Sequence, residues 1–171
     1  MVSIVSSPSA WFDSAVADLD DDVILVSPHI VAGFAQFIAE AAAGSPRTWA
    51  VVTTIDPTAA ARGYLSVDGL RMLLDAEVQI QHVDRLRTHC FFVGRRALLG
   101  TANLGTADES SGYLDAEDEA SDEDAPGAPM ELAVELTGDQ LAEAWARIAR
   151  RRSVVVTARD LDWLRAQVRQ A

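Results

Sequence analysis

Apolar residues along the chain follow two spacings, one typical of buried strands and one typical of amphipathic helices. Short apolar runs predict strands at residues 22–27, 49–54, 78–82, 88–93, 97–101 and 131–136. Helical spacing covers 9–19, 30–43, 67–76 (with Ser66 as N-cap), 141–149 and a last helix beginning at Thr157 or Asp160. Residues 57–64 are ambiguous and are interpreted as a loop, and 153–156 is a short strand or a tight connection. Strands alternating with helices predict an α/β fold with a mixed, mostly buried sheet flanked by helices.

Two of these strands form a predicted hairpin around Gly94-Arg-Arg96. Strand alternation places His89 on one face together with Arg87, Phe91 and Val93, and Cys90 on the opposite face, in the core. The return strand then brings Gly100-Thr-Ala-Asn103 beside His89, although His89 and Asn103 are 14 positions apart. An imidazole attacks phosphorus, while amide and backbone N–H groups hold phosphate oxygens. The hairpin therefore predicts a phosphate pocket.

The order of these residues resembles the phospholipase D superfamily. Its motif is His-x-Lys, four residues, Asp, and then about six residues to Gly-Ser/Thr-x-Asn. His89 matches the histidine, and Gly100, Thr101 and Asn103 match the Gly-Ser/Thr-x-Asn turn. The segment 24–30 is similar to an early strand with its Ser-Pro-Tyr turn, and Glu131 falls where single-motif nucleases of the superfamily carry a glutamate. The resemblance covers roughly residues 10–150.

The resemblance implies a single phospholipase D-like domain over residues 1–171, with an extra C-terminal helix at 157–170. It implies that His89 is the nucleophile, that Asn103 and Glu131 assist it, and that no metal or other cofactor is needed. Gly100, Thr101 and Arg87 are then the candidate substrate-binding residues. Single-motif members resemble symmetric dimers in which two histidines meet across a two-fold axis. The expected assembly is a homodimer, or a heteromer with other subunits.

The sequence departs from the motif at two positions. Phe91 stands where the motif has lysine, and Arg96 stands at the aspartate position counted from His89. Loss of a positioned cation from a phosphoryl-transfer site costs about 3–4 kcal/mol, or 10²–10³ in rate, judged by similar single-donor deletions. Arg87 either supplies a substitute charge, since its guanidinium suits phosphate, or points into solvent at the end of the strand.

Charge is distributed very unevenly over the 171 residues. The net charge is −12, and the segment 108–124 contributes nine acidic residues and no basic one. We interpret 108–129 as a solvated acidic loop, or else as a DNA-mimicking or partner-docking element. Residues 147–169 carry seven arginines and two aspartates. They are interpreted as helix-end and solvated charges, with a phosphate-contacting surface or a dock for the acidic loop as alternatives.

The remaining composition narrows the possible classes of protein. All 14 basic residues are arginine, which excludes a lysine Schiff base or P-loop lysine. The single cysteine excludes an intramolecular disulfide and a multi-cysteine metal site, and it favours the reducing cytoplasm. No apolar run approaches the roughly 20 residues of a membrane span, and residues 1–16 do not resemble a signal peptide. His29 is interpreted as a loop residue and His82 as a surface residue.

Two functions of different class follow. The departures at Phe91 and at the aspartate position, together with the acidic charge, favour a degenerate, non-catalytic or weakly active dimeric subunit of a nucleic-acid-processing or defence complex. The retained His89, Gly100, Thr101, Asn103 and Glu131 favour the alternative, an active metal-independent nuclease or phosphodiesterase that forms a phosphohistidine intermediate. Nucleic acid is the expected ligand in both cases, and a membrane is not.

Overall fold

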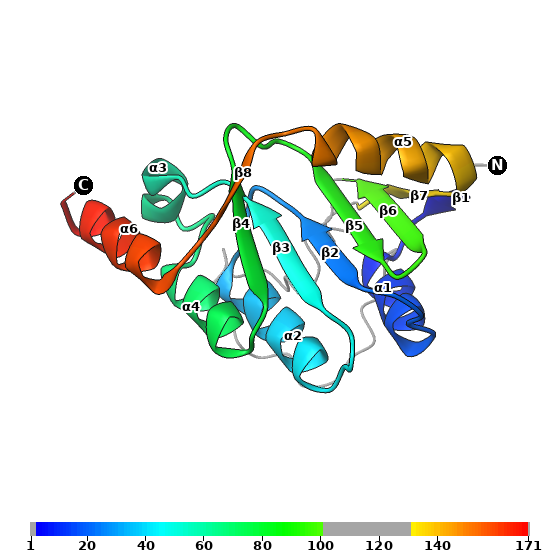
Figure 1. Ribbon diagram of the computed structural model, residues 1–171, viewed down its shortest axis with the longest axis horizontal. Coiled ribbons are helices and arrows are strands. Elements are labelled where there is room, and N and C mark those ends of the chain that lie inside the picture. Colours follow the sequence, from blue (N-terminus) through cyan, green and yellow to red (C-terminus); the bar gives the residue numbers. More distant parts are fainter. Residues whose placement is uncertain (1–2, 101–130, 171) are drawn as a thin grey trace, which may run out of the picture.

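The structure is a computed structural model that describes residues 3–100 and 131–170 (Figure 1). Its strands are β1 (Ser3–Val5), β2 (Val23–Val26), β3 (Trp49–Thr53), β4 (Gln79–Val83), β5 (His89–Val93), β6 (Arg96–Gly100), β7 (Ala133–Leu136) and β8 (Ser153–Val155). Its helices are α1 (Pro8–Ala17), α2 (Ala32–Ala43), α3 (Pro57–Ala61), α4 (Val67–Asp75), α5 (Gly138–Ala149) and α6 (Ala158–Gln170).

Within the described residues, the strands form one mixed sheet in the order β1-β7-β6-β5-β2-β3-β4-β8. β2, β3 and β4 are parallel to one another, and each of the other neighbouring pairs is antiparallel. Parallel strands need crossover connections, which α2 provides between β2 and β3, and α3 and α4 provide between β3 and β4. The predicted α/β fold with a mixed sheet flanked by helices is confirmed.

The two faces of the sheet are covered unequally. On one face, α1, α2, α4 and α6 pack over a large apolar core that contains Phe12, Phe34, Leu70 and Leu161. On the other face, α5 places Leu141, Ala144 and Ile148 over a smaller cluster that includes Phe92. Figure 1 shows α2 and α4 below the sheet and α5 above it.

Local sequence signals place several element boundaries as expected. Ser66 caps α4 by accepting a hydrogen bond from the Gly69 N–H at 2.9 Å. Gly94 has a φ of 60°, the left-handed conformation that a tight hairpin turn requires and that glycine adopts without strain. The hairpin between β5 and β6 therefore forms where the sequence predicts it.

The structure adds two elements that the apolar pattern did not indicate. The first is α3, which lies within the residues interpreted as a loop at 57–64. This helix has Pro57 in its first turn, and Asp56 caps it by accepting a hydrogen bond from the Thr58 N–H at 2.9 Å. The second is β1, only three residues long, which pairs with the distant β7. The segment 153–156, for which the sequence allows a strand or a connection, contains the edge strand β8.

Some predictions lie outside the described residues, among them the acidic loop at 108–129 and the positions of Thr101 and Asn103. Among the helices of residues 3–100 and 131–170, none is both long and apolar enough to traverse a bilayer. The same residues contain no group of three or more His, Cys, Asp or Glu side chains arranged to hold a metal ion.

Candidate functional site

His89 lies at the first position of β5, beside the end of β2. In the antiparallel register of these strands, Val26 pairs with Cys90, so Ser27 and His89 are the next residues beyond that pair. Ser27 is completely buried, and its backbone N–H still donates to the Val52 carbonyl of β3 at 2.9 Å. The site therefore sits at the carboxyl ends of the parallel strands, the edge where open α/β sheets bind ligands.

The Ser27 hydroxyl lies at the centre of the polar contacts around the His89 ring. Ser27 Oγ donates to the His29 carbonyl at 2.8 Å, and it accepts from the His29 N–H at 3.3 Å. It also lies 3.1 Å from His89 Nδ1. A hydroxyl that donates to the His29 carbonyl has no second proton to give, so in that arrangement His89 Nδ1 is the donor in this third contact. The proton on Nδ1 leaves a lone pair on Nε2, which is the atom that a nucleophile or an acceptor uses.

The environment of His89 also favours its neutral form. Burial lowers the pKa of His89 below its ordinary value of 6.5, and the neighbouring His29 lowers this pKa further. A neutral imidazole keeps its lone pair at physiological pH, whereas an imidazolium does not.

This lowered pKa makes stability depend on pH. The unfolded chain takes up a proton at His89 near pH 6.5, whereas the folded chain does so only at lower pH. Unfolding therefore binds a proton below pH 6.5, and the free energy of unfolding falls as the pH falls through this window. We expect His89→Gln to show a smaller drop between pH 7.5 and pH 5.5 than the unmodified protein, as measured by urea titration. An equal drop in both proteins would contradict the burial of His89 as a neutral ring.

A second imidazole and a phenol lie next to His89. The ring centroids of His29 and His89 are 5.9 Å apart in an edge-to-face arrangement. The other side of the cluster is Tyr64, whose ring stacks on His29 at 5.2 Å with an interplanar angle of 25°. The sequence indicates a loop residue at position 29; His29 does lie in the loop after β2, but its ring belongs to this cluster.

The hairpin brings one of the predicted phosphate-binding residues beside His89. Gly100 on β6 is the direct cross-strand partner of His89. A Cβ atom at Gly100 would lie 2.6 Å from the Ala133 Cβ on β7, so glycine is required here for the strands to approach. Glu131 is half-buried two residues before Ala133, at the same end of the sheet as His89, with β6 between the two strands. The convergence of His89 with Thr101 and Asn103 stays a prediction.

The two departures from the motif have separate structural roles. Phe91 is 2% exposed and packs in the main core, with its ring 5.9 Å from that of Phe34. Arg96 lies at the opposite end of β6 from Gly100 and forms two hydrogen bonds of 3.0 Å with Glu135. Its guanidinium also lies over the Trp11 ring, 5.1 Å from the centroid. The Arg96 hydrogen bonds hold the pKa of Glu135 below its ordinary value.

Three other sequence candidates take structural positions. Arg87 is exposed just before β5. Cys90 is fully buried on the face opposite Phe91, and burial raises the pKa of its thiol to about 12, so the thiol is unreactive. His82 is half-buried rather than a surface residue, and its Nδ1 accepts from the Ile55 N–H at 2.9 Å.

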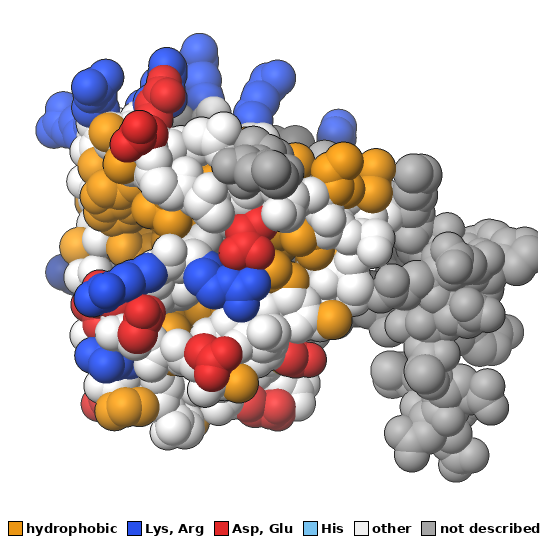
Figure 2. All heavy atoms as spheres, turned by 90° about the vertical axis from the view of Figure 1, so that its right-hand side faces the viewer, with side chains coloured by type: hydrophobic (Ala, Val, Ile, Leu, Met, Phe, Trp, Pro, Cys, Tyr) orange, Lys and Arg blue, Asp and Glu red, His pale blue; other side chains and the backbone are white. Residues whose placement is uncertain are grey.

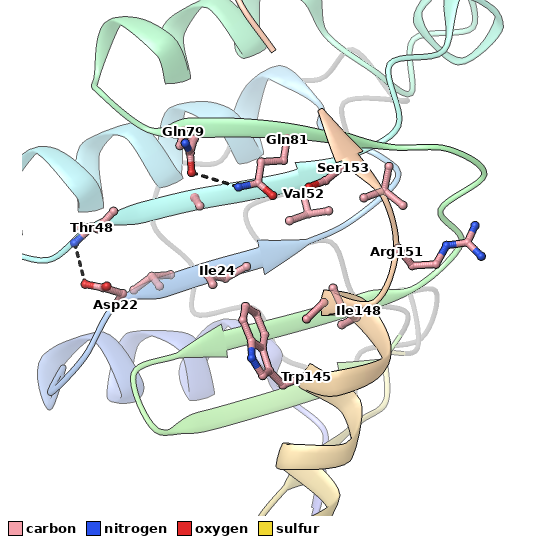
Figure 3. A pocket seen from close by; sticks show the side chains of 14 residues that line it. Asp22, Ile24, Thr48, Val52, Gln79, Gln81, Trp145, Ile148, Arg151 and Ser153 are labelled. Carbon is pink, nitrogen blue, oxygen red and sulfur yellow. Dashed lines mark hydrogen bonds between the residues drawn. The ribbon is translucent and has the colours of Figure 1, made fainter. Parts of the chain in front are cut away.

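A separate cavity of about 320 Å³ lies on the other side of the sheet, between α5 and strands β2 to β4 (Figure 3). Its polar groups are largely engaged with one another: Asp22 accepts from the Thr48 N–H, and Gln81 donates to Gln79, each at 3.1 Å. Trp145 and Ile148 form its apolar wall. No histidine is among the described residues that line this cavity, so it is distinct from the histidine cluster.

Sequence reasoning missed Ser27 and Tyr64 as members of the site. Ser27-Pro-His29 follows a buried strand, and that position was a usable signal because the ends of parallel strands collect ligands. Tyr64 carries no such signal. It reaches His29 through the parallel bridge between Ile30 and Leu65, which pairs residues 35 positions apart.

The described residues form an α/β fold with a mixed sheet, in which His89 opens the strand next to β2. Among solved structures, the chain is similar to Nuc from Salmonella typhimurium, a phospholipase D family member, with a TM-score of 0.56 and 14% identity. The match covers 90% of this chain and 97% of Nuc. At this identity, the likeness shows the fold.

A second solved structure is TrmBL2, an archaeal chromatin protein with a novel mode of DNA binding. Its TM-score is 0.48 at 10% identity, and the match covers 90% of this chain and 55% of the TrmBL2 chain. This chain thus spans little more than half of TrmBL2. No protein-family model matches the sequence, and no curated protein matches it.

Proposed function

We propose that this chain is a degenerate phospholipase D-like domain that binds the phosphates of nucleic acid without turning them over efficiently. In this proposal it acts as a dimeric subunit, paired with itself or with other subunits, in a nucleic-acid-processing or defence complex. The active-site histidine position is kept, but the cation that would neutralise a reacting phosphate is not.

The burial of Phe91 is the observation that carries this proposal. At the motif lysine position the chain places a core side chain with 2% exposure. Within residues 3–100 and 131–170, no arginine forms a hydrogen bond with His89, and the neighbour that shifts its pKa is another histidine. A neutral site of this kind can accept or donate hydrogen bonds to phosphate, but it stabilises developing negative charge poorly.

The positive charge instead lies at a neighbouring exposed edge. The arginine edge consists of five exposed residues from two segments, namely Arg85, Arg87, Arg150, Arg151 and Arg152. The Arg151 guanidinium donates to the Asp84 carbonyl at 3.1 Å, and Val83 pairs with Ser153, so the two segments lie side by side. Figure 2 shows several arginine side chains projecting along the upper edge of the molecule, with acidic side chains beside some of them. Such an edge suits a phosphate backbone.

A second candidate function is an active, metal-independent phosphodiesterase, and the state of the His89 ring favours it. The Nε2 lone pair would attack phosphorus, forming a P–N bond while the P–O bond to the leaving group breaks. The leaving oxygen would take a proton from the corresponding imidazolium of a second copy of the chain. Water, giving a proton to the imidazole of the second copy, would then attack phosphorus and break the P–N bond, which restores the neutral His89 ring and the imidazolium of the second copy.

One set of samples separates the two candidates. Binding of labelled single-stranded DNA is measured by fluorescence anisotropy at rising salt, and hydrolysis of bis-p-nitrophenyl phosphate is measured in metal-free buffer. We expect log K to fall linearly with log salt. The double variant Arg150→Gln/Arg152→Gln should show a shallower dependence of log K on log salt, with the slope reduced by about 1 for each phosphate that it no longer neutralises. The control Arg47→Gln, an exposed arginine just before β3 and so at the other end of the sheet, should leave the slope unchanged.

The hydrolysis measurement decides on catalysis. We expect the unmodified protein to hydrolyse the diester no more than marginally faster than His89→Ala. A high rate that disappears in His89→Ala would overturn the proposal of a degenerate site and support the phosphodiesterase. A salt-independent affinity would overturn the phosphate-binding role.

A further inference from the structure

An exposed aromatic ring stands at the outer end of the histidine cluster. Tyr64 is 51% exposed, although one face of its ring is covered by the stacked His29 ring. Large aromatic side chains usually lose most of their exposure on folding, because burial of apolar area is favourable. A ring that is stacked on one face and open to solvent elsewhere offers a surface for another planar group.

The backbone holds this ring in place before any ligand arrives. The Ile30 N–H donates to the Tyr64 carbonyl at 3.1 Å, and the Ser66 N–H donates to the Ile30 carbonyl at 2.7 Å. The Tyr64 N–H in turn donates to the Ala59 carbonyl at 2.9 Å. The loop that carries Tyr64 is thereby tied both to the His29 loop and to α3. Little conformational entropy would be lost when a ligand stacks on the ring.

The three rings form a continuous row from the surface to His89. Tyr64 contacts His29 at 5.2 Å between centroids, and His29 contacts His89 at 5.9 Å. A nucleotide carries both a planar base and a phosphate. We propose that Tyr64 stacks on a base of single-stranded nucleic acid whose phosphate lies at His29 and His89.

This inference rests on the proposed function and names its ligand class. A single strand fits better than a duplex, because bases in a duplex are already stacked on their neighbours and present no free face. Stacking of a base on an aromatic side chain is tolerant of sequence, so the site would distinguish strandedness rather than a particular base.

The test compares two oligomers of equal length and charge, a labelled oligo-dT and an abasic deoxyribose-phosphate chain. Affinities are measured by fluorescence anisotropy at one salt concentration. Tyr64→Ala should weaken binding of oligo-dT about tenfold and leave binding of the abasic chain unchanged. Tyr64→Phe, which keeps the ring, should bind as the unmodified protein does.

Trp145→Leu is the matched control, since Trp145 is 41% exposed but lies on the other face of the sheet, at the 320 Å³ cavity. It should bind both oligomers normally. Loss of oligo-dT binding in Trp145→Leu but not in Tyr64→Ala would place the base contact at that cavity and overturn this inference. Equal binding of both oligomers by every variant would also overturn it, because no base contact would then contribute to affinity. Binding of neither oligomer by the unmodified protein would instead overturn the proposed function.

Discussion

Replacing Phe91 with alanine is expected to lower the free energy of unfolding by about 3–5 kcal/mol. The side chain is 2% exposed, and it lies between Leu25 of β2 and Leu98 of β6 with Phe34 of α2 against its ring. Alanine would leave a cavity in this packed layer that its neighbours fill only in part. Denaturant titration followed by tryptophan fluorescence measures the loss. Leu99→Ala, on the neighbouring strand and 38% exposed, should cost about 1 kcal/mol or less.

Phe91→Lys tests the functional meaning of the same position. A lysine there would bury an ammonium group without a partner, so this variant should be at least as unstable as Phe91→Ala and should gain no phosphodiesterase activity. If Phe91→Lys folded as stably as the unmodified protein and hydrolysed a phosphodiester, the position would belong to the site. The degenerate assignment would then be wrong.

Residue 91 connects the core to the candidate site. Its aromatic side chain adds apolar contacts in the core and brings no positive charge to the neighbourhood of His89. The remaining groups of the cluster are a hydroxyl, two imidazoles and a phenol. Such a set offers a ligand hydrogen bonds and stacking rather than charge, as the proposed binding role requires.

Local signals predicted the parts of the site that lie close together in the sequence. Gly94 marks the turn, strand alternation separates Cys90 from Phe91, and the hairpin then fixes the pairing of His89 with Gly100. Each of these inferences depends on a few residues of neighbouring chain, where backbone conformation and side-chain period are decisive.

Pairings between distant segments were not predictable in the same way. Ser27 and His89 are 62 residues apart, and their contact depends on β2 lying beside β5 rather than beside another strand. The Tyr64 contact with His29 depends on one bridge between two loops. Arg96 falls in the predicted turn, but its two hydrogen bonds with Glu135 on the distant β7 could not be read from the sequence. Strand order and loop contacts arise from the packing of the whole sheet, which periodicity does not encode.

Ser27 is the residue on which the state of His89 depends. Ser27 is completely buried, and its hydroxyl contacts the His89 ring and both the N–H and the carbonyl of the His29 backbone. An alanine there would leave the His89 Nδ1–H and the His29 backbone without these bonds. It would also remove the acceptor that keeps the proton on Nδ1, so Nε2 would no longer be held as the free lone pair.

We therefore expect Ser27→Ala to lower the free energy of unfolding by about 1–3 kcal/mol and to move the His89 proton toward Nε2. Denaturant titration measures the first effect, and the ¹⁵N chemical shifts of the ring nitrogens measure the second. Thr53→Val is the control, because the Thr53 hydroxyl is equally buried but has no hydrogen-bond partner among the described residues. That variant should be neutral or slightly stabilising, since it removes an unpaired polar group. If Ser27→Ala behaved like Thr53→Val and the proton stayed on Nδ1, Ser27 would have no part in positioning His89.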